Sequence, residues 1–240
     1  MDVNGKTILL TGGTDGIGRE LAQQLRSQGA HLIVTGRTPA RIAEMAAAGF
    51  ETIKADLSQQ DGVDIVLKMV GSRPIDILIN NAGAGSDHDF RVAPPDLADN
   101  DRCIFLNLNA PIHLITHLIP VLKARPEAMI VNVTSGLAIA PRAGGPVYCA
   151  TKAALRSYTQ AIRAQLAGTN IHVLEALPPV VETKLTAGRG SKKMAPADCA
   201  RQIIAAMQRN ANEANVGLVK LLQAVHSLSP ALARKIMLRF

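Results

Sequence analysis

The sequence predicts an α/β protein, built as one doubly wound parallel sheet of about seven strands with helices on both faces. Short aliphatic segments alternate with amphipathic ones along the 240 residues, which is typical of right-handed β–α–β units. Hydrophobic residues make up 48% of the chain but aromatic residues only 2%, so the core must be built from small and branched aliphatic side chains. Such side chains suit strands that are buried on both faces. We expect a single domain over residues 1–240.

A glycine-rich turn joins the first strand to the first helix. The aliphatic run Thr7 to Leu10 leads into Thr11-Gly12-Gly13-Thr14-Asp15-Gly16-Ile17-Gly18. Gly12 lets the chain turn off the strand, Gly16 lets the backbone approach a pyrophosphate, and Gly18 lets the helix pack close to the sheet. The free N–H groups at the start of the helix would then face the phosphates of a dinucleotide. An ordinary β–α turn is the alternative, because a glycine motif alone is weak evidence.

The remaining elements follow from periodicity and from Gly and Pro residues. We expect further strands at 31–35, 51–55, 75–79, 128–133, 171–176 and 216–220. We expect further helices at 39–48, 58–70, 103–122, 147–166 and 196–208, and an amphipathic C-terminal helix near 221–240. Ser58 is a candidate N-cap for the helix that begins there. Residues 82–100 are expected to form a loop.

Charge and cysteine content restrict the class of protein. The chain carries 26 Lys and Arg against 19 Asp and Glu, but these cations are scattered, so we expect no nucleic-acid partner. The three cysteines show no CxxC spacing, which favours a reducing compartment, and no signal peptide is recognised, so a cytoplasmic location is expected. No apolar run reaches about 18 residues, so we expect no integral membrane segment.

The end of the second strand indicates which dinucleotide would bind. An acidic residue about 20 positions after the glycines would bind the ribose 2′-hydroxyl of NAD. The chain has Gly36 there, followed by Arg37, whose guanidinium suits a 2′-phosphate. We therefore predict NADP(H), with NAD(H) less favoured, and a solvated surface arginine is the alternative. Asp15 does not support this preference, because a basic residue at that position would have strengthened it.

Two further strand ends carry candidate cofactor contacts. Asp56 follows the third strand and could accept a hydrogen bond from the adenine amino group, or could instead cap the next helix. Asn80-Asn81-Ala82-Gly83 follows the fourth strand, and small residues and amides there suit the floor of a cofactor crevice.

The most specific pattern joins Ser135, Tyr148 and Lys152. Tyr148 and Lys152 are four residues apart at the start of a helix and so share one face. A nearby ammonium lowers the pKa of a tyrosine from about 10, which makes the phenol a usable proton donor to a carbonyl oxygen. Ser135 could hydrogen-bond the same oxygen. An isolated Tyr-x-x-x-Lys pair is usually an exposed helical pair. Here Ser135, the glycine turn and Asn80 to Gly83 all precede it in order, which favours a catalytic pair.

With these motifs in place, the chain from Lys6 to about Thr183 resembles the short-chain dehydrogenase/reductase family. The matching segments are TGGTDGIG, NNAG, FLNLNAP, VNVTSG, YCATK and PPVVET, and several look similar to the DltE-like subgroup. The resemblance implies a Rossmann-type fold, a homodimer or homotetramer, and hydride transfer between nicotinamide and a carbonyl or secondary alcohol. It also implies the catalytic residues Asn107, Ser135, Tyr148 and Lys152, in which Asn107 would hold a water or backbone link toward Lys152, and Lys152 would bind the nicotinamide ribose.

The expected cofactor contacts come from the glycine turn, the strand ends and the segment after the sixth strand. They are Thr11, Gly12, Thr14, Asp15, Gly16, Ile17, Gly18, Arg37, Asp56, Leu57, Asn81, Ala82, Gly83, Tyr148, Lys152, Pro178, Val181 and Thr183. One position departs from the family, because Pro179 stands where a glycine is usual. The fixed φ of a proline leaves the contacts of Val181 and Thr183 less certain and is expected to narrow the pocket.

The activity predicted from these residues is an NADP(H)-dependent ketoreductase with a small-molecule substrate. A non-catalytic NADP(H)-binding sensor or scaffold is the alternative, and so is a membrane-surface protein that binds through the C-terminal helix. For that helix, packing over the active site or against another subunit is preferred. The segments 84–101 and 183–195 are expected to shape the substrate pocket. His113 and His117 are four apart but lack a third ligand, so no metal site is predicted.

Overall fold

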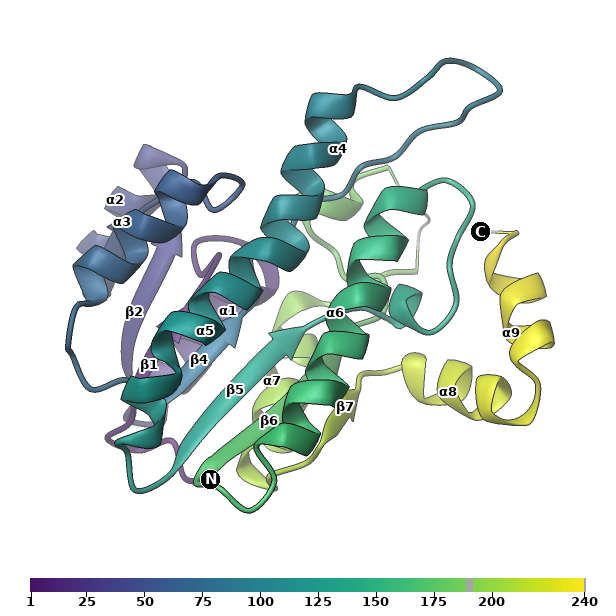
Figure 1. The fold of residues 1–240 in the computed structure, drawn as a ribbon. Coiled ribbons are helices and arrows are strands. Elements are labelled where there is room, and N and C mark those ends of the chain that lie inside the picture. Colours follow the sequence, from purple (N-terminus) through teal and green to yellow (C-terminus); the bar gives the residue numbers. More distant parts are fainter. Residues whose placement is uncertain (189–191, 240) are drawn as a thin grey trace.

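The computed structural model describes residues 1–188 and 192–239. In this part of the chain a parallel sheet has the strand order β3-β2-β1-β4-β5-β6-β7, with helices on both faces (Figure 1). The predicted doubly wound fold of about seven strands is thus confirmed. The strands are β1 (Thr7–Leu10), β2 (His31–Gly36), β3 (Glu51–Lys54), β4 (Ile77–Asn80), β5 (Ala128–Val133), β6 (Ile171–Leu177) and β7 (Glu213–Asn215).

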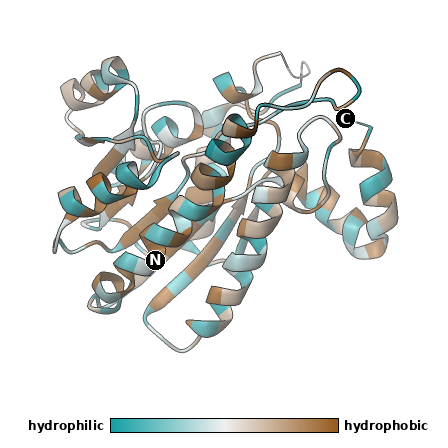
Figure 2. Ribbon diagram, turned by 45° about the horizontal axis from the view of Figure 1, so that its top comes forward, coloured by the Kyte–Doolittle hydropathy of each residue, from teal (hydrophilic) through white to brown (hydrophobic). Residues whose placement is uncertain are grey.

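Alternating side chains of each strand enter two separate cores. Ile8 and Leu10 of β1 belong to the core on one face of the sheet, and Leu9 between them belongs to the core on the other face. The helices α1 (Gly16–Ser27) and α7 (Pro196–Gln208) cover the first face, while α3 (Gln60–Val70), α5 (Ala110–Lys123) and α6 (Pro146–Gln165) cover the second. Figure 2 shows the apolar strands between helices whose outer sides are hydrophilic. Burial on both faces explains why the strands are continuous aliphatic runs.

The other helical elements are shorter. They are α2 (Pro39–Ala47), α4 (Leu97–Ile104), a π-helical turn (Phe105–Asn109), two 3₁₀ turns (Gly136–Ala138 and Lys184–Thr186), α8 (Val219–Leu228) and α9 (Pro230–Met237).

Several expected boundaries are wrong for local reasons. Ser58 does not cap α3, because the helix begins at Gln60 and its N-cap residue is Gln59, which has an extended backbone. The Ser58 N–H instead donates to the Asp56 carboxylate at 3.1 Å. The expected loop 82–100 ends early, because Asp96 caps α4 by accepting from the Ala98 N–H at 2.9 Å. The long helix expected at 103–122 therefore begins at Leu97 and contains the π-helical turn.

The C-terminal part differs most from expectation. The last strand is Glu213–Asn215 and not 216–220, since Gly217 adopts a left-handed φ of 54° and α8 starts at Val219. The single helix expected at 221–240 is two helices, because Ser229 is extended, caps α9 and precedes Pro230. Residue 240 lies outside the described residues, as do 189–191 of the segment 183–195.

The continuous helix Leu97–Lys123 has the length and hydropathy of a possible membrane span, which the sequence was not expected to contain. Leu114, Leu118 and Leu122 on one side of it are buried in the core beside the sheet. A core helix of a globular domain passes the same test of length and composition, so this observation alone is weak evidence for a span.

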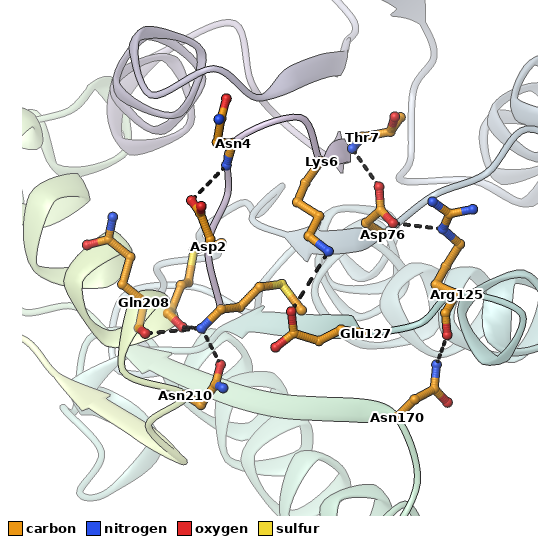
Figure 3. A network of polar contacts seen from close by, with 12 residues as sticks. Asp2, Asn4, Lys6, Thr7, Asp76, Arg125, Glu127, Asn170, Gln208 and Asn210 are labelled. Atoms are coloured by element: carbon orange, nitrogen blue, oxygen red, sulfur yellow. Dashed lines mark hydrogen bonds and ion pairs between the residues drawn. The ribbon is translucent and has the colours of Figure 1, made fainter.

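The amino ends of the strands are held by a polar network (Figure 3). The carboxylate of Asp76, just before β4, accepts the Thr7 N–H at 2.8 Å and the Arg125 Nε at 2.7 Å. Asn170 donates to the Arg125 carbonyl at 2.6 Å, which brings the start of β6 into the same network. Asp76 is buried and Arg125 is partly exposed, so the carboxylate depends on these two donors. This network therefore holds β1, β4 and β6 together at their amino ends, opposite to the end of the sheet that carries the glycine turn.

We expect Asp76→Asn to lower the free energy of unfolding by about 1–3 kcal/mol, because hydrogen bonds to a buried charge are worth about that much. Urea unfolding followed by circular dichroism would measure the change. The affinity for NADPH should stay the same, because Asp76 lies at the far end of β4 from the glycine turn. A midpoint equal to that of the unsubstituted protein would contradict this role of the network.

Candidate active site

The carboxyl ends of the central strands form the candidate site. The strand order reverses between β1 and β4, and in open parallel sheets ligands bind at such a switch point. The glycine turn follows β1, Asn81 to Gly83 follow β4, and Ser135 follows β5. The topology thus brings together three motifs that are far apart in the sequence.

The glycine turn needs its glycines for two different reasons. Gly12 and Gly16 have left-handed φ angles of 64° and 51°, which side chains disfavour. Gly18 has no room for a side chain, because a Cβ would lie 2.1 Å from the Gly12 carbonyl oxygen and 2.5 Å from the Asn81 amide nitrogen. The start of α1 therefore lies directly against the end of β1. The three glycines thus stand where a side chain would be strained or would clash, and binding of a pyrophosphate at this turn stays a prediction.

Thr11 and Asn81 lock the turn to the end of β4. The Thr11 hydroxyl accepts the N–H groups of Asn81 and Ala82, each at 3.0 Å. The Asn81 side chain donates back to the carbonyls of Thr11 at 3.0 Å and Gly12 at 3.1 Å. Asn81 thus fastens the glycine turn to the end of β4 with its backbone and side chain, and the role of Ala82 and Gly83 as the floor of a cofactor crevice stays a prediction.

A second cluster surrounds the ends of β2 and β3. A hollow of about 460 Å³ has two cations, Arg37 and Lys54, in its lining together with Asp56, and lies at one side of the glycine turn. Thr14 is buried next to Gly36, and a Cβ added at Gly36 would lie 2.5 Å from the Thr14 Cγ2. Lys54 was missed because the sequence shows only a polar residue at the end of a short strand.

Asp15 has two partners within the protein. Its carboxylate caps α1 by accepting the Gly16 N–H at 2.9 Å, and it forms an ion pair with Arg41 of α2. This pairing was not expected from the sequence. It offsets the negative charge that Asp15 would otherwise place beside a cofactor phosphate. The helix begins at Gly16 and has no acidic residue in its first turn, which includes Ile17.

Tyr148 and Lys152 lie on one face of α6, next to the end of β5. The Lys152 ammonium nitrogen is 5.8 Å from the centre of the Tyr148 ring and donates to the Val133 carbonyl at 2.9 Å. Ser135, two residues beyond Val133, accepts the Leu137 N–H at 3.1 Å with its hydroxyl. Ser135, Tyr148 and Lys152 are all buried. The structure therefore brings together the three residues that the sequence linked.

Asn107 occupies the π-helical turn between α4 and α5. Its side-chain amide accepts from the Ala84 N–H at 3.0 Å and donates to the Ala84 carbonyl at 2.8 Å. It also donates to the Thr151 hydroxyl of α6 at 3.1 Å. Gly83 lies between Asn107 and Lys152, since a Cβ there would be 3.0 Å from the Asn107 oxygen and 3.5 Å from the Lys152 nitrogen. Asn107 thus holds the start of the segment 84–101. Single π-helical turns of this kind are frequent at functional sites.

Burial changes the acid–base properties of Lys152. Desolvation of the ammonium lowers the pKa of Lys152 to about 8, and the nearby Cys103 raises it by a smaller amount. Near neutral pH the ammonium is therefore charged but holds its proton weakly. A cation here can stabilise a phenolate on Tyr148 and can attract an anionic cofactor.

A buried bridge links the strand that carries Ser135 to the helix that carries Tyr148. Thr134 donates its hydroxyl to the Glu175 carboxylate of β6 at 2.7 Å, and Arg156 of α6 donates to the other carboxylate oxygen at 2.7 Å. Arg156 also pairs with Glu213 of β7 at 3.0 Å. Glu175 is fully buried, and desolvation raises its pKa. We missed this bridge because an acidic residue inside an aliphatic strand has no partner that spacing alone can indicate.

The segment after β6 reaches back to the glycine turn. The Thr183 Cγ2 lies 2.9 Å from where a Cβ of Gly16 would be, and Val181 is buried. The Pro178 carbonyl accepts the Gly136 N–H at 2.9 Å, next to Ser135. Pro179 lies beside Gly217, at the start of the C-terminal region. Asp56 and Leu57 follow β3, which is separated from β1 and its glycine turn by β2 in the sheet.

Comparison with known proteins gives the family. The model of the family described as short chain dehydrogenase matches residues 6–194. This chain is a short-chain dehydrogenase/reductase. It is 42% identical over 191 residues to the uncharacterized oxidoreductase DltE of Bacillus subtilis, covering 77% of this chain and 75% of that protein, which confirms the DltE-like resemblance. It is 34% identical to serine 3-dehydrogenase of Agrobacterium fabrum, covering 75% of this chain and 74% of that protein.

Solved structures confirm the fold. A short-chain dehydrogenase from Burkholderia cenocepacia in complex with NADP has a TM-score of 0.88 at 22% identity and covers 99% of both chains. One from Sphingobium yanoikuyae in complex with NADPH has a TM-score of 0.83 at 25% identity, covering 95% of this chain and 94% of that one. As a short-chain dehydrogenase/reductase, this protein is an NAD(P)-dependent oxidoreductase.

We expect NADPH binding to weaken above about pH 8, because Lys152 loses its charge there and no longer attracts the cofactor. The Tyr148→Phe variant removes the competing phenol, so its dissociation constant measured between pH 7 and 9.5 should rise by up to about tenfold per pH unit above the break. A constant affinity across this range would show that Lys152 does not titrate there.

We expect Thr134→Val to lower kcat by about tenfold while the Kd for NADPH stays unchanged, because Thr134, the neighbour of Ser135, loses its hydrogen bond to Glu175. Thr134→Ser keeps the hydroxyl and should restore most of the rate. Asp76→Asn is the matched control, since it breaks a buried carboxylate network at the opposite edge of the sheet. Equal loss of stability in Thr134→Val and Asp76→Asn with kcat unchanged in both would show that the bridge only stabilises the fold.

Proposed function

We propose that this short-chain dehydrogenase/reductase is a ketoreductase that uses NADPH to reduce the carbonyl group of a small molecule. The observation that carries the proposal is the buried Lys152 ammonium beside the Tyr148 ring and next to Gly83. A buried cation next to a phenol has a clear chemical use in proton transfer, and burial of an ammonium without such a use is costly.

The residues of this chain fit a bound NADP(H) molecule. Gly12, Gly16 and Gly18 would hold the pyrophosphate, Lys152 the nicotinamide ribose, and Val181 and Thr183 the nicotinamide amide. The bound cofactor would supply a hydride to the substrate carbon. A Cβ at Gly16, Gly18 or Gly83 would lie within about 3.0 Å of a neighbouring atom, so these positions of the site require glycine.

The protein groups would perform the proton chemistry. The Tyr148 hydroxyl donates its proton to the substrate oxygen as negative charge develops there, and the Ser135 hydroxyl donates a hydrogen bond to the same oxygen. The Lys152 ammonium lowers the cost of the phenolate that remains on Tyr148. Asn107 keeps the backbone at Ala84 in place, so that the crevice floor stays fixed during these steps.

The preference for NADP(H) over NAD(H) rests on charge. Arg37 and Lys54 border one hollow, while Arg41 offsets Asp15, so the 2′-phosphate would meet a net positive environment. Similar structures were solved in complex with NADP or NADPH, although one from Burkholderia phymatum is a complex with NAD. Three buried cysteines without disulfides support our further proposal of a cytoplasmic location.

The substrate would lie between Ser135, Tyr148 and the segments 84–101 and 183–195. Two relatives are named serine 3-dehydrogenase and NADP-dependent 3-hydroxy acid dehydrogenase, and both names give a small hydroxy compound as the substrate. A small polar carbonyl compound is therefore the first class to assay. Proline at position 179 is compatible with this site, because it packs beside Gly217 and the hydrogen bond from Gly136 to Pro178 is kept.

We expect the purified protein to oxidise NADPH more efficiently than NADH across a panel of small ketones and oxo acids. Tyr148→Phe should lower kcat by at least about a hundredfold, because general acid catalysis contributes that much, while NADPH still binds. Steady-state absorbance at 340 nm and cofactor fluorescence would measure the two effects.

Two results would contradict the proposal in different ways. Equal efficiency with NADH would remove the cofactor preference. NADPH binding without turnover of any carbonyl compound would favour the non-catalytic sensor instead.

A further inference from the structure

The C-terminal hairpin is a part of the molecule that the active site does not use. We give this name to residues 218–239, which form α8 and α9 and lie outside the segment that the family model matches. Figure 1 shows it in yellow at one side of the molecule, with α9 standing apart from the sheet. The hairpin is fixed at its base, where Val219 lies close to Gly136, and Ala233 of α9 is buried.

The outer faces of the hairpin are apolar. Leu218, Leu221 and Leu228 lie along one side of α8 at spacings of three and seven, and Leu228 is 89% exposed. Leu232 and Ile236 are four apart on α9 and are also exposed. Scattered single leucines are ordinary on a protein surface, but exposed apolar residues at helical spacing on two successive helices are typical of an interaction site.

The same hairpin carries only positive charges. Lys220, Arg234, Lys235 and Arg239 are exposed, and residues 218–239 contain no Asp or Glu. No ion pair involves these four cations within the described residues. Four uncompensated charges beside a leucine stripe require a partner that is both apolar and acidic.

A surface of that kind exists on this same chain. We call residues 89–104 the acidic segment; it contains four aspartates and two arginines, so its net charge is negative. Asp89 pairs with Arg91 and Asp99 with Arg102, so in the part of the chain that the structure describes the uncompensated charges are those of Asp96 and Asp101. Its large apolar side chains are also exposed, and these are Phe90, Val92, Leu97 and Ile104. Val92 is 84% exposed. The segment thus combines negative charge with apolar groups, as the hairpin combines positive charge with apolar groups.

We infer that the C-terminal hairpin of one copy docks on the acidic segment of a second copy, and reciprocally. Each copy has both surfaces, so a two-fold axis would form the contact twice with no unmatched patch. Pairing of two hairpins with each other is disfavoured, because eight cations would meet without an acid, counting the four of each copy.

An anionic membrane is a weaker partner than a second copy. It would match the hairpin, but the acidic segment follows β4 and the hairpin packs near Gly136 after β5, so both lie toward the carboxyl ends of the strands. A bilayer against the hairpin would therefore bring the acidic segment toward negative head groups, which costs free energy.

Charge reversal with mixing tests the contact. Arg234→Glu with Lys235→Glu reverses the hairpin, and Asp99→Lys with Asp101→Lys reverses the acidic segment. Lys68→Glu with Arg201→Glu is the control for the hairpin reversal, because it makes the same change in net charge on α3 and α7. Light scattering after size exclusion would give the molar mass of each protein and of a one-to-one mixture of the two reversed variants, with NADPH binding as the check of folding.

We expect each reversed variant alone to have half the molar mass of the unsubstituted protein, because its own two surfaces repel. The mixture should regain the full mass, because both contacts are then complementary between copies but not within one. The control should keep the full mass.

A mass unchanged by both reversals, a mixture that does not reassociate, or an unsubstituted protein that stays monomeric would overturn the inference. So would flotation of the monomer with vesicles of phosphatidylcholine and phosphatidylglycerol, which would point to the membrane. None of these outcomes depends on turnover, so they do not affect the proposed reductase activity.

Discussion

The buried ammonium of Lys152 is the interaction on which the rest of the site depends. An isolated cation in a protein interior is costly, and this one is stabilised by the Val133 carbonyl at 2.9 Å and by the nearby Tyr148 ring. The end of β5 and the start of α6 must therefore stay together. Several features that look separate in the sequence, including Gly83, Asn107 and the bridge through Glu175, keep this small region closed and ordered.

The sheet topology places this cation at the right end of the molecule. Parallel strands deliver their carboxyl ends to one edge, and the reversal between β1 and β4 leaves a crevice there. The polar network of Asp76 holds the other edge, far from the crevice. The fold thus separates the groups that mainly stabilise it from those that perform the chemistry, with Glu175 as a residue that belongs to both.

Much of this arrangement could be predicted from the sequence, because it depends on local rules. Gly12, Gly16 and Gly18 identify a turn by their spacing, Tyr148 and Lys152 share a helix face, and continuous aliphatic runs identify buried strands. The predictions failed where tertiary contacts decide. The partners of Glu175 and Asp15 come from elements distant in the sequence. The early end of the loop before α4 is a local error instead, because Asp96 caps the helix by accepting the Ala98 N–H. The break at Ser229 in the C-terminal helix was readable from Pro230, but the apolar periodicity hid it.

The clamp formed by Asn107 has a consequence for how such an enzyme could diversify. Both backbone groups of Ala84 are held by one amide side chain, so the polypeptide is anchored where the crevice floor ends. Exchanges at exposed positions beyond that anchor, such as Phe90 and Val92, would therefore leave the proton-handling groups in place. The fixed point therefore divides the chain into a part constrained by reaction chemistry and a neighbouring part that is free to acquire new ligand selectivity.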